Sequence, residues 1–369
     1  MIFPSVTLVQ NFLKCRRYGP ALREKQRPKK SLNFLDVSVK KFLMVIVGKG
    51  MCWSRAEDDV REFIERTQLP FLASPMGKGV IPDDHPLSIA PAHSTALQET
   101  DLVFLVGARL NWIMHFGLPP RFNENVRVIQ LDISPEEIGT NVPAEVGLVG
   151  DAKAVMGQIN AVLEQSPWSY PQETTWWTQL QAKAEENIQS VQAMEADDSS
   201  PMNYYHVLGA VRDALPKDAI ISSEGASTMD IGRTVLPNYY PRHRLDAATF
   251  GTMGVGLGQA IAAAIVHPEK KVVAVEGDSG FGFSAMEVET ACRYQLPITF
   301  IIVNNNGIGG GPSKLDPDRI PPGAYTPNAH YEQIIEAFGG KGFYVTESSE
   351  LQETLKKAIA MDEPTIVNI

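Results

Sequence analysis

The chain has 369 residues, which at roughly 100 to 200 residues per domain predicts two or three domains. Its 44% hydrophobic and 21% charged residues exclude a mostly disordered chain, and a net charge of -10 argues against nucleic acid as a partner. Three widely spaced cysteines exclude a disulfide framework and a zinc site. Because no apolar run approaches the roughly 20 residues of a membrane-spanning helix, we expect a soluble chain without a membrane partner.

The first 41 residues differ in composition from the rest and form an unassigned basic N-terminal segment. They contain ten lysine and arginine residues but only two acidic residues, Glu24 and Asp36. A basic, acid-poor start is typical of a transit peptide, but a disordered tail or an artefactual start has the same composition, and we favour these two.

Residues 42–165 predict a middle domain of the Rossmann-like, doubly wound kind. Its continuous apolar runs are typical of strands that a parallel sheet buries on both faces, and amphipathic stretches between them predict helices. The strands are expected at residues 42–47, 71–73, 102–106 and 126–131, and the helices at 55–67 and 91–99.

Residues 166–203 predict a linker, because prolines and a run of small polar and acidic residues flank one long expected helix at 172–194. The alternation of strands and helices resumes in residues 204–369 and predicts a second domain. The fold class is therefore α/β, with two doubly wound parallel-sheet domains. In the second domain, strands are expected at 219–223, 272–275, 298–303, 342–345 and 365–369, and helices at 205–214, 228–236, 254–266, 284–294, 331–338 and 351–360.

One strand–helix–strand unit of the second domain carries a candidate metal site. Asp278 follows one expected strand, and Asn305 follows the next, 27 residues later. Such a crossover returns both residues to the carboxyl edge of a parallel sheet, where they can face the same point. A carboxylate, an amide oxygen and the main-chain carbonyl of Gly307 are hard oxygen ligands of the kind that Mg²⁺ accepts.

The glycines of the same unit predict an anion beside the metal. The sequence GDSGFGF at residues 277–283 lets backbone amides approach an anion, and the N-terminus of a helix near Gly282 adds further N–H groups. A tight turn and an ordinary loop would explain a lone Gly-Asp-Ser. The glycine cluster, the 27-residue spacing and Asn304-Asn305 together favour a magnesium diphosphate site.

Several motifs of the second domain resemble those of the 2-hydroxyacyl-CoA lyase family of thiamine-diphosphate-dependent enzymes, whose close relative is oxalyl-CoA decarboxylase. Ser279 stands where the general thiamine-diphosphate fingerprint has glycine, and serine is the usual residue in this family. The resemblance covers about residues 42–369. The motifs are SEGASTMDIGR at 223–233, TFGTMGVG at 249–256, EGDS at 276–279 and MEVET at 286–290.

The resemblance implies roles for individual residues. Asp278, Asn305 and the Gly307 carbonyl would hold Mg²⁺. Met253 would wedge beneath the bend of the cofactor, although methionine at such a position is also an ordinary filler of core gaps. The residues implied in binding thiamine diphosphate are Gly225, Ala226, Gly251, Thr252, Met253, Ser279 and Gly280.

The middle domain contains a second candidate site. Gly48, Arg109 and Asp132 each follow an expected strand, and the resemblance to oxalyl-CoA decarboxylase implies that they contact ADP. A Gly-x-Gly turn alone is a weak signal, and structural caps and loop residues explain the three positions equally well.

The resemblance also implies parts that this sequence is expected to lack. The glutamate that activates the cofactor belongs to an N-terminal pyrimidine-binding domain in the family, and Glu224 and Glu276 lie in the wrong domain, so the catalytic residue is unknown. Losing such a group typically costs 10² to 10⁴ in rate, so we expect weak activity from the chain alone. The family's C-terminal tail is also missing, and Gly309-Gly310-Gly311 replaces a segment that carries a tyrosine in animal members.

The expected function is cleavage of a 2-hydroxyacyl-CoA to formyl-CoA and an aldehyde one carbon shorter, by a truncated form of such a lyase. Oxalyl-CoA decarboxylase is the alternative within the same chemistry, and a non-catalytic cofactor-binding module that associates with a full-length subunit is the alternative outside it. The implied partners are an acyl-CoA substrate and either further copies of the chain or a chain supplying the pyrimidine-binding domain. The implied location is the peroxisome, although the C-terminal targeting tripeptide is absent, and otherwise the cytoplasm.

Overall fold

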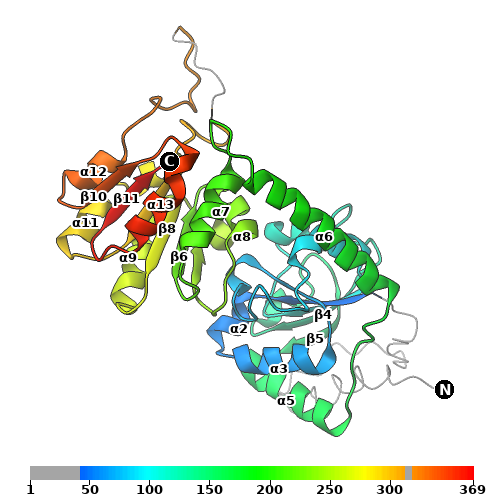
Figure 1. The fold of residues 1–369 in the computed structure, drawn as a ribbon. Helices are drawn as coiled ribbons and strands as arrows, with labels where there is room; N and C mark the ends of the chain where they lie inside the picture. The colour runs from blue at the N-terminus through cyan, green and yellow to red at the C-terminus, as the bar shows by residue number, and fades with distance from the viewer. Residues whose placement is uncertain (1–41, 312–317) are drawn as a thin grey trace. The chain divides into compact units, whose positions relative to one another are not determined.

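The computed structural model describes residues 42–311 and 318–369, which form two compact units divided between Asn187 and Ile188 (Figure 1). Each unit is built around one sheet, and every strand pair in both sheets is parallel. The predicted fold class, two parallel-sheet α/β domains, is confirmed. The basic segment 1–41 lies outside the described residues.

The sheet of the first unit has the strand order β2-β1-β3-β4-β5. Two of its three inner strands, β1 and β3, are buried at every position, as their uninterrupted apolar sequences LMVIV and LVFLV predict for strands covered on both faces. The edge strand β5 alternates instead, with Val146 and Leu148 buried between less buried neighbours. The five strands are β1 (Leu43–Val47), β2 (Phe71–Ala73), β3 (Leu102–Val106), β4 (Arg127–Asp132) and β5 (Ala144–Val149).

Amphipathic helices cover this sheet. In α3, Val60, Phe63 and Ile64 form the buried stripe, and three acidic residues in the first turn complement the positive end of the helix dipole. Helix α5 lies beside α3 (Figure 1) and begins at Asp151, whose side chain caps the amide of Ala154. The helices of this part of the chain are α2 (Lys49–Trp53), α3 (Glu57–Thr67), α4 (His93–Glu99), α5 (Ala152–Gln165) and α6 (Thr175–Glu195), with 3₁₀ turns at Pro75–Gly77, Ala90–Ala92, Trp112–Gly117 and Pro135–Glu137.

The segment predicted as a linker, residues 166–203, is mostly the helix α6, and the division between the two units falls inside this helix. Trp176, Trp177 and Leu180 in its first half are buried in the core of the first unit. Tryptophan and leucine side chains bury large apolar areas, which anchors this half of the helix to the sheet's core. The second half of the helix belongs to the second unit, and within that unit Glu195 forms an ion pair with Arg212 over 2.6 Å.

The sheet of the second unit has the strand order β10-β11-β9-β8-β6-β7. Its strands are β6 (Ile220–Glu224), β7 (Arg244–Asp246), β8 (Val272–Gly277), β9 (Thr299–Val303), β10 (Lys341–Tyr344) and β11 (Thr365–Asn368). Alternate residues of β8 enter two separate hydrophobic cores: Val273 and Val275 join one, and Val272 and Ala274 join the other. Period-two alternation therefore builds a core on each face of the sheet.

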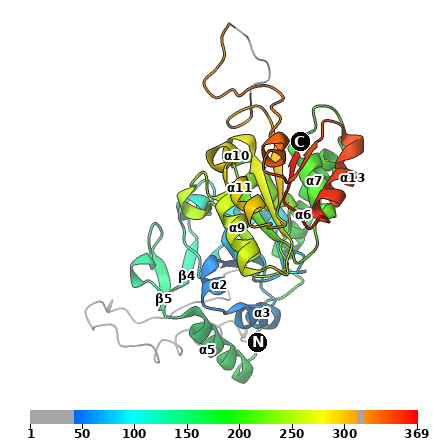
Figure 2. The same cartoon turned by 90° about the vertical axis from the view of Figure 1, so that its left-hand side faces the viewer.

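Helices lie on both faces of this sheet, which makes a three-layer arrangement. Figure 2 shows α9 and α11 on one side and α7 and α13 on the other. Helices α7, α8 and α13 supply the first core, and α9, α10, α11 and α12 supply the second. The helices are α7 (Tyr204–Ala214), α8 (Ala226–Val235), α9 (Gly256–Val266), α10 (Asp278–Ser284), α11 (Glu287–Arg293), α12 (Glu332–Glu336) and α13 (Ser348–Ile359), with a 3₁₀ turn at Ala248–Phe250.

The structure contains elements that the periodicity did not predict. The edge strands β5 and β7 were missed, β7 because it is only three residues long and two of them are charged. The helix expected at 284–294 is α11, which begins at Glu287, and a separate helix that was not expected, α10, precedes it and begins directly at Asp278. Glycine-rich sequence hides this helix from propensity arguments, since glycine is a poor helix former.

Within the part of the chain that the structure describes, no helix combines the length and apolar character needed to cross a membrane.

Candidate active site

The carboxyl ends of β8 and β9 bring the two predicted metal ligands to one edge of the sheet. The strands are adjacent and parallel, with Gly277 opposite Val303. Asp278 follows β8 directly, and Asn305 lies two residues beyond the end of β9. The third predicted ligand, Gly307, donates its backbone N–H to Asp278 Oδ2 over 2.8 Å. The predicted crossover therefore places these three residues side by side.

Backbone amides hold the carboxylate of Asp278 in place. Ser279 N donates to Oδ1 over 2.7 Å, and Gly307 N donates to Oδ2. The residue is only 2% exposed, and burial raises the pKa of Asp278, while the N–H donors oppose this shift. Each carboxylate oxygen can accept more than one hydrogen bond or ligand contact, so Asp278 retains lone pairs for a cation.

The amide of Asn305 leaves one oxygen without a partner. Its Nδ2 donates to the Tyr204 hydroxyl over 2.8 Å and to the Gly309 carbonyl over 2.7 Å. Its Oδ1 is buried and accepts no hydrogen bond from any described residue. A buried amide oxygen without a donor costs free energy, and a cation is one ligand that satisfies it.

These residues fit Mg²⁺. The donor set is one carboxylate, one amide oxygen and the main-chain carbonyl of Gly307, all hard oxygen ligands. Mg²⁺ usually takes only one or two carboxylates and fills its other positions with water and phosphate. No group of three or more His, Cys, Asp or Glu side chains suited to a metal occurs among the described residues. A softer transition-metal site is therefore not built into this part of the chain.

A cavity of about 610 Å³ opens beside Asp278. Its lining includes hydroxyl groups, which are suited to binding a phosphate. The hydroxyls of Tyr325, Thr326 and Tyr331 were not predicted from the sequence. Burial raises the pKa of Tyr331 to about 12, so this hydroxyl remains a donor at neutral pH. The lining residues are Asp278, Ser279, Gly282, Phe283, Ala324, Tyr325, Thr326, Ala329 and Tyr331.

The predicted diphosphate contacts lie around the end of β6 and the start of α10. Ser279 is half-buried and lines the cavity, and Gly280 is buried where a Cβ would lie 3.3 Å from Glu224 Cγ. Gly225 has a φ of +97°, and a Cβ there would lie 3.2 Å from the amide nitrogen of Gly277. Glycine at 225 therefore allows the two strand ends to approach closely, and Ala226 beyond it is exposed.

The predicted cofactor-binding residues 251–253 lie largely at the surface of the unit. Gly251 and Thr252 are exposed, and Met253 is half-buried. The three residues that follow this segment are held to the end of β6, because Glu224 accepts hydrogen bonds from the amides of Gly254, Val255 and Gly256. Three donors on one buried carboxylate fix where the segment ends and where α9 begins.

A second buried carboxyl group lies beside Glu224. Glu276 is fully buried, and neither of its carboxyl oxygens has a hydrogen-bond partner among the described residues. Burial, followed by repulsion from Glu224, raises the pKa of Glu276 well above its usual range. Burial therefore favours the protonated, uncharged form of Glu276. The sequence had placed both glutamates outside the cofactor-activating role and gave no sign that they form a pair.

The three candidate residues of the first unit are largely bonded within the unit. A Cβ on Gly48 would lie 2.1 Å from the Gly107 carbonyl oxygen, so the close approach of two backbone segments already requires this glycine. Arg109 forms ion pairs with Asp132 over 3.3 Å and with Glu137 over 3.1 Å. These three carboxyl-edge residues thus have clear structural roles.

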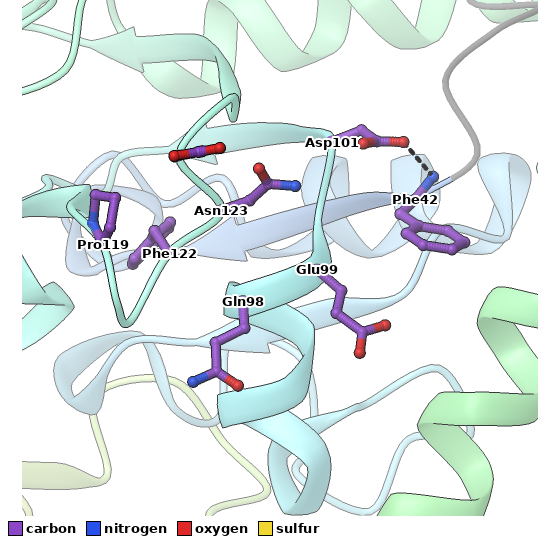
Figure 3. A pocket seen from close by; sticks show the side chains of 8 residues that line it. Phe42, Gln98, Glu99, Asp101, Pro119, Phe122 and Asn123 are labelled. Carbon is purple, nitrogen blue, oxygen red and sulfur yellow. Dashed lines mark hydrogen bonds between the residues drawn. The ribbon is translucent and has the colours of Figure 1, made fainter.

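The hollow that Figure 3 shows lies at the opposite, amino edge of the first sheet and has a volume of about 510 Å³. Asp101 precedes β3 and accepts a hydrogen bond from the Phe42 amide, just before β1, over 3.4 Å. None of the predicted site residues lines this hollow. Its lining consists of Phe42, Gln98, Glu99, Asp101, Pro119, Phe122, Asn123 and Glu124.

Two family models match the chain. Residues 37–159 match the thiamine pyrophosphate enzyme central domain, and residues 224–369 match the thiamine pyrophosphate enzyme C-terminal TPP binding domain. The second match contains both strand ends of the candidate site, and the first contains Gly48, Arg109 and Asp132.

Curated relatives match over most of the chain. The 2-hydroxyacyl-CoA lyase 1 of Homo sapiens is 50% identical over 344 residues, which cover 88% of this chain and 59% of the relative. The 2-hydroxyacyl-CoA lyase of Arabidopsis thaliana is 44% identical with the same coverages. The oxalyl-CoA decarboxylase of Escherichia coli K12 is 42% identical over 330 residues, 88% of this chain and 58% of the relative. The chain thus spans less than two thirds of the length of these relatives.

Proposed function

Because the chain contains the central domain and the C-terminal TPP binding domain of the thiamine pyrophosphate enzymes, we propose that its second unit binds the magnesium diphosphate of thiamine diphosphate at the ends of β8 and β9. The observation that carries this proposal is the buried Asn305 Oδ1, which has no donor among the described residues and lies at the same sheet edge as Asp278.

Different residues of the chain bind the metal ion and the diphosphate. Asp278, Asn305 Oδ1 and the Gly307 carbonyl hold Mg²⁺, and the hydroxyls of Ser279 and Tyr331 in the adjoining cavity orient the diphosphate. The other contacts that we propose are those of Gly225, Ala226 and Gly280 with the diphosphate and of Gly251, Thr252 and Met253 with the aminopyrimidine. When bound, thiamine diphosphate supplies an electron sink for cleavage of a carbon–carbon bond.

We further propose that the reaction is that of a 2-hydroxyacyl-CoA lyase, which releases formyl-CoA and an aldehyde one carbon shorter. The 50% identity to the human lyase, against 42% to oxalyl-CoA decarboxylase, supports this choice. The activating glutamate and part of the acyl-CoA site would then come from segments of the relatives that this chain does not match, supplied by a partner chain that carries the pyrimidine-binding domain. Association of further copies of this chain into a homo-oligomer is the alternative assembly. As part of the same proposal, we place the protein in the peroxisome.

For the first unit we propose ADP as ligand, with weaker structural support. The Arg109 side chain is 42% exposed at the carboxyl edge of the sheet, and its positive charge suits a phosphate. Its present partners are Asp132 and Glu137, so a nucleotide would have to compete with two carboxylates. Gly48, in the turn after β1, would line the same nucleotide site.

The experiment is a calorimetric titration of the chain with thiamine diphosphate, with and without Mg²⁺. We expect binding that requires the metal, and absence of metal-dependent binding would contradict the proposal. Activity is then measured as formyl-CoA released from a 2-hydroxyacyl-CoA, for the chain alone and mixed with a full-length relative. Oxalyl-CoA in parallel assays separates the two substrate classes, and binding without turnover in either mixture would indicate a non-catalytic module.

A further inference from the structure

Tyr204 contacts the candidate metal ligand Asn305 from outside the βαβ unit. It is the first residue of α7, whose start is capped by the Asn203 side chain, which accepts a hydrogen bond from the amide of His206. Its half-buried hydroxyl accepts a hydrogen bond from Asn305 Nδ2 over 2.8 Å. The two residues are 101 positions apart in the sequence. This contact therefore depends on α7 packing beside the sheet.

The partners of Nδ2 determine which way the Asn305 amide faces. Its other acceptor is the Gly309 carbonyl, 2.7 Å away, and a carbonyl can only accept. Turning the amide by 180° would place Oδ1 against that carbonyl oxygen, and two acceptors repel each other. The amide oxygen is thereby directed away from both partners, where it is buried and has no donor among the described residues.

A third side chain holds the Tyr204 hydroxyl. Burial raises the pKa of Tyr204, and a hydrogen bond from Thr228 of α8, which is itself only 2% exposed, opposes this rise. The Thr228 hydroxyl oxygen would lie 3.1 Å from a Cβ on Gly277, the residue directly before Asp278. The series of side-chain contacts Thr228–Tyr204–Asn305 thus connects α8, α7 and the loop after β9. These three elements surround the end of β8, which Asp278 follows.

We propose that Tyr204, supported by Thr228, is a positioning residue that presents the Asn305 amide oxygen to the metal ion. This inference rests on the proposed function, since it assigns Asn305 to the magnesium site. Neither Tyr204 nor Thr228 needs to touch the metal or the diphosphate in this role. A fixed amide orientation raises metal affinity, because the apo chain need not reorient the ligand when the ion binds.

The test measures metal affinity rather than activity. Mn²⁺, followed by the relaxation of water protons, is titrated into the full chain with and without inorganic pyrophosphate. We expect Tyr204→Phe to weaken Mn²⁺ binding about fivefold in both conditions, the effect of losing one hydrogen bond of ordinary strength. A hydroxyl that instead contacts the phosphate would affect binding only when pyrophosphate is present, and that result would overturn the proposal.

Tyr205→Phe is the matched control, because the neighbouring tyrosine packs against the same core formed by α7, α8 and α13 and loses the same hydroxyl, whereas Asn305 Nδ2 donates to the hydroxyl of Tyr204. It should bind Mn²⁺ like the wild type, and an equal loss in both variants would contradict a positioning role. Thermal unfolding verifies that each variant is folded.

Thr228→Val provides a second, independent measurement. It should weaken Mn²⁺ binding less than Tyr204→Phe and add nothing when the two are combined, because both act through the same hydroxyl. Full additivity would overturn the proposed chain of contacts. Failure of the wild type to bind Mn²⁺ would overturn the proposed function as well, whereas a wild type that binds and a Tyr204→Phe variant that binds equally would overturn this inference alone.

Discussion

The two units share one architecture but differ at the carboxyl edges of their sheets. At the edge of the first unit, Arg109 lies between Asp132 and Glu137, and each charge has an opposite partner. At the edge of the second unit, Asn305 Oδ1 and both carboxyl oxygens of Glu276 are buried and have no hydrogen-bond partner among the described residues.

The difference shows how an α/β fold acquires a site. A parallel sheet collects polar residues at its carboxyl edge in either unit, but an edge whose polar atoms satisfy one another is already stable without a ligand. Buried polar atoms without partners destabilise the fold until something binds them. The second unit is therefore the stronger candidate for a bound metal and diphosphate.

The largest effect is expected on metal affinity, when the carboxylate at the edge of the second unit's sheet loses its charge. Asp278→Asn deletes the charge of the candidate metal site while keeping the shape of the side chain, so Mg²⁺ affinity in the presence of diphosphate should fall roughly 100-fold or more, about 2.7 kcal/mol. Calorimetric titration measures it. Asp132→Asn is the matched control, since Asp132 also ends a buried strand, and it should leave this affinity unchanged.

The next effect tests the structural role of the first unit's edge. Gly48→Ala places a Cβ 2.1 Å from the Gly107 carbonyl oxygen, and such overpacking should lower the free energy of unfolding by about 1–3 kcal/mol without changing diphosphate binding. Urea denaturation measures it. Gly258→Ala in α9, where a Cβ would meet nothing within 4 Å, should instead leave stability equal or raise it. Equal stability of wild type and Gly48→Ala would contradict the close packing.

A third effect concerns the buried carboxyl group of Glu276. Because burial raises its pKa, the native chain keeps a proton that the unfolded chain loses above the usual glutamate pKa. The free energy of unfolding contributed by this group is therefore fully present below that usual pKa and falls by up to about 1.4 kcal/mol per pH unit as the pH rises toward the raised pKa.

Glu276→Gln should remove this part of the pH dependence, because the amide does not ionise. Chemical denaturation across the pH range measures the slope. Glu353→Gln, at an exposed position of α13, should keep the wild-type slope. An unchanged slope in Glu276→Gln would show that the buried acid is ionised in the native chain.

The smallest effect is expected at the exposed edge of the first unit. Arg109→Gln breaks ion pairs that are partly solvated, so stability should change by less than about 1 kcal/mol. Magnesium diphosphate binding should not change. If the first unit binds ADP through this arginine, titration with ADP should show weaker binding in the variant, and identical ADP affinity would remove Arg109 from that role.

The continuous apolar strands and the spacing between Asp278 and Asn305 were readable from the sequence. Runs such as LVFLV at β3 predict strands because each residue is apolar enough to be buried on either face. The crossover rule then places the ends of β8 and β9 at one edge. The strand β7 was not readable, since Arg244 and Asp246 are charged residues that only their surroundings make buried.

The site was predictable only where its residues follow one another along the βαβ unit. Tyr204 and Tyr331 come from other elements, and nothing in their local sequence distinguishes them from core tyrosines. The sequence by itself determined the parallel sheets and the residues at their ends, because hydrophobic periodicity and crossover handedness are local properties. Tertiary structure decided which buried oxygens have partners and that the pKa of Glu276 is raised, because desolvation and hydrogen-bond geometry depend on atoms far apart in the chain.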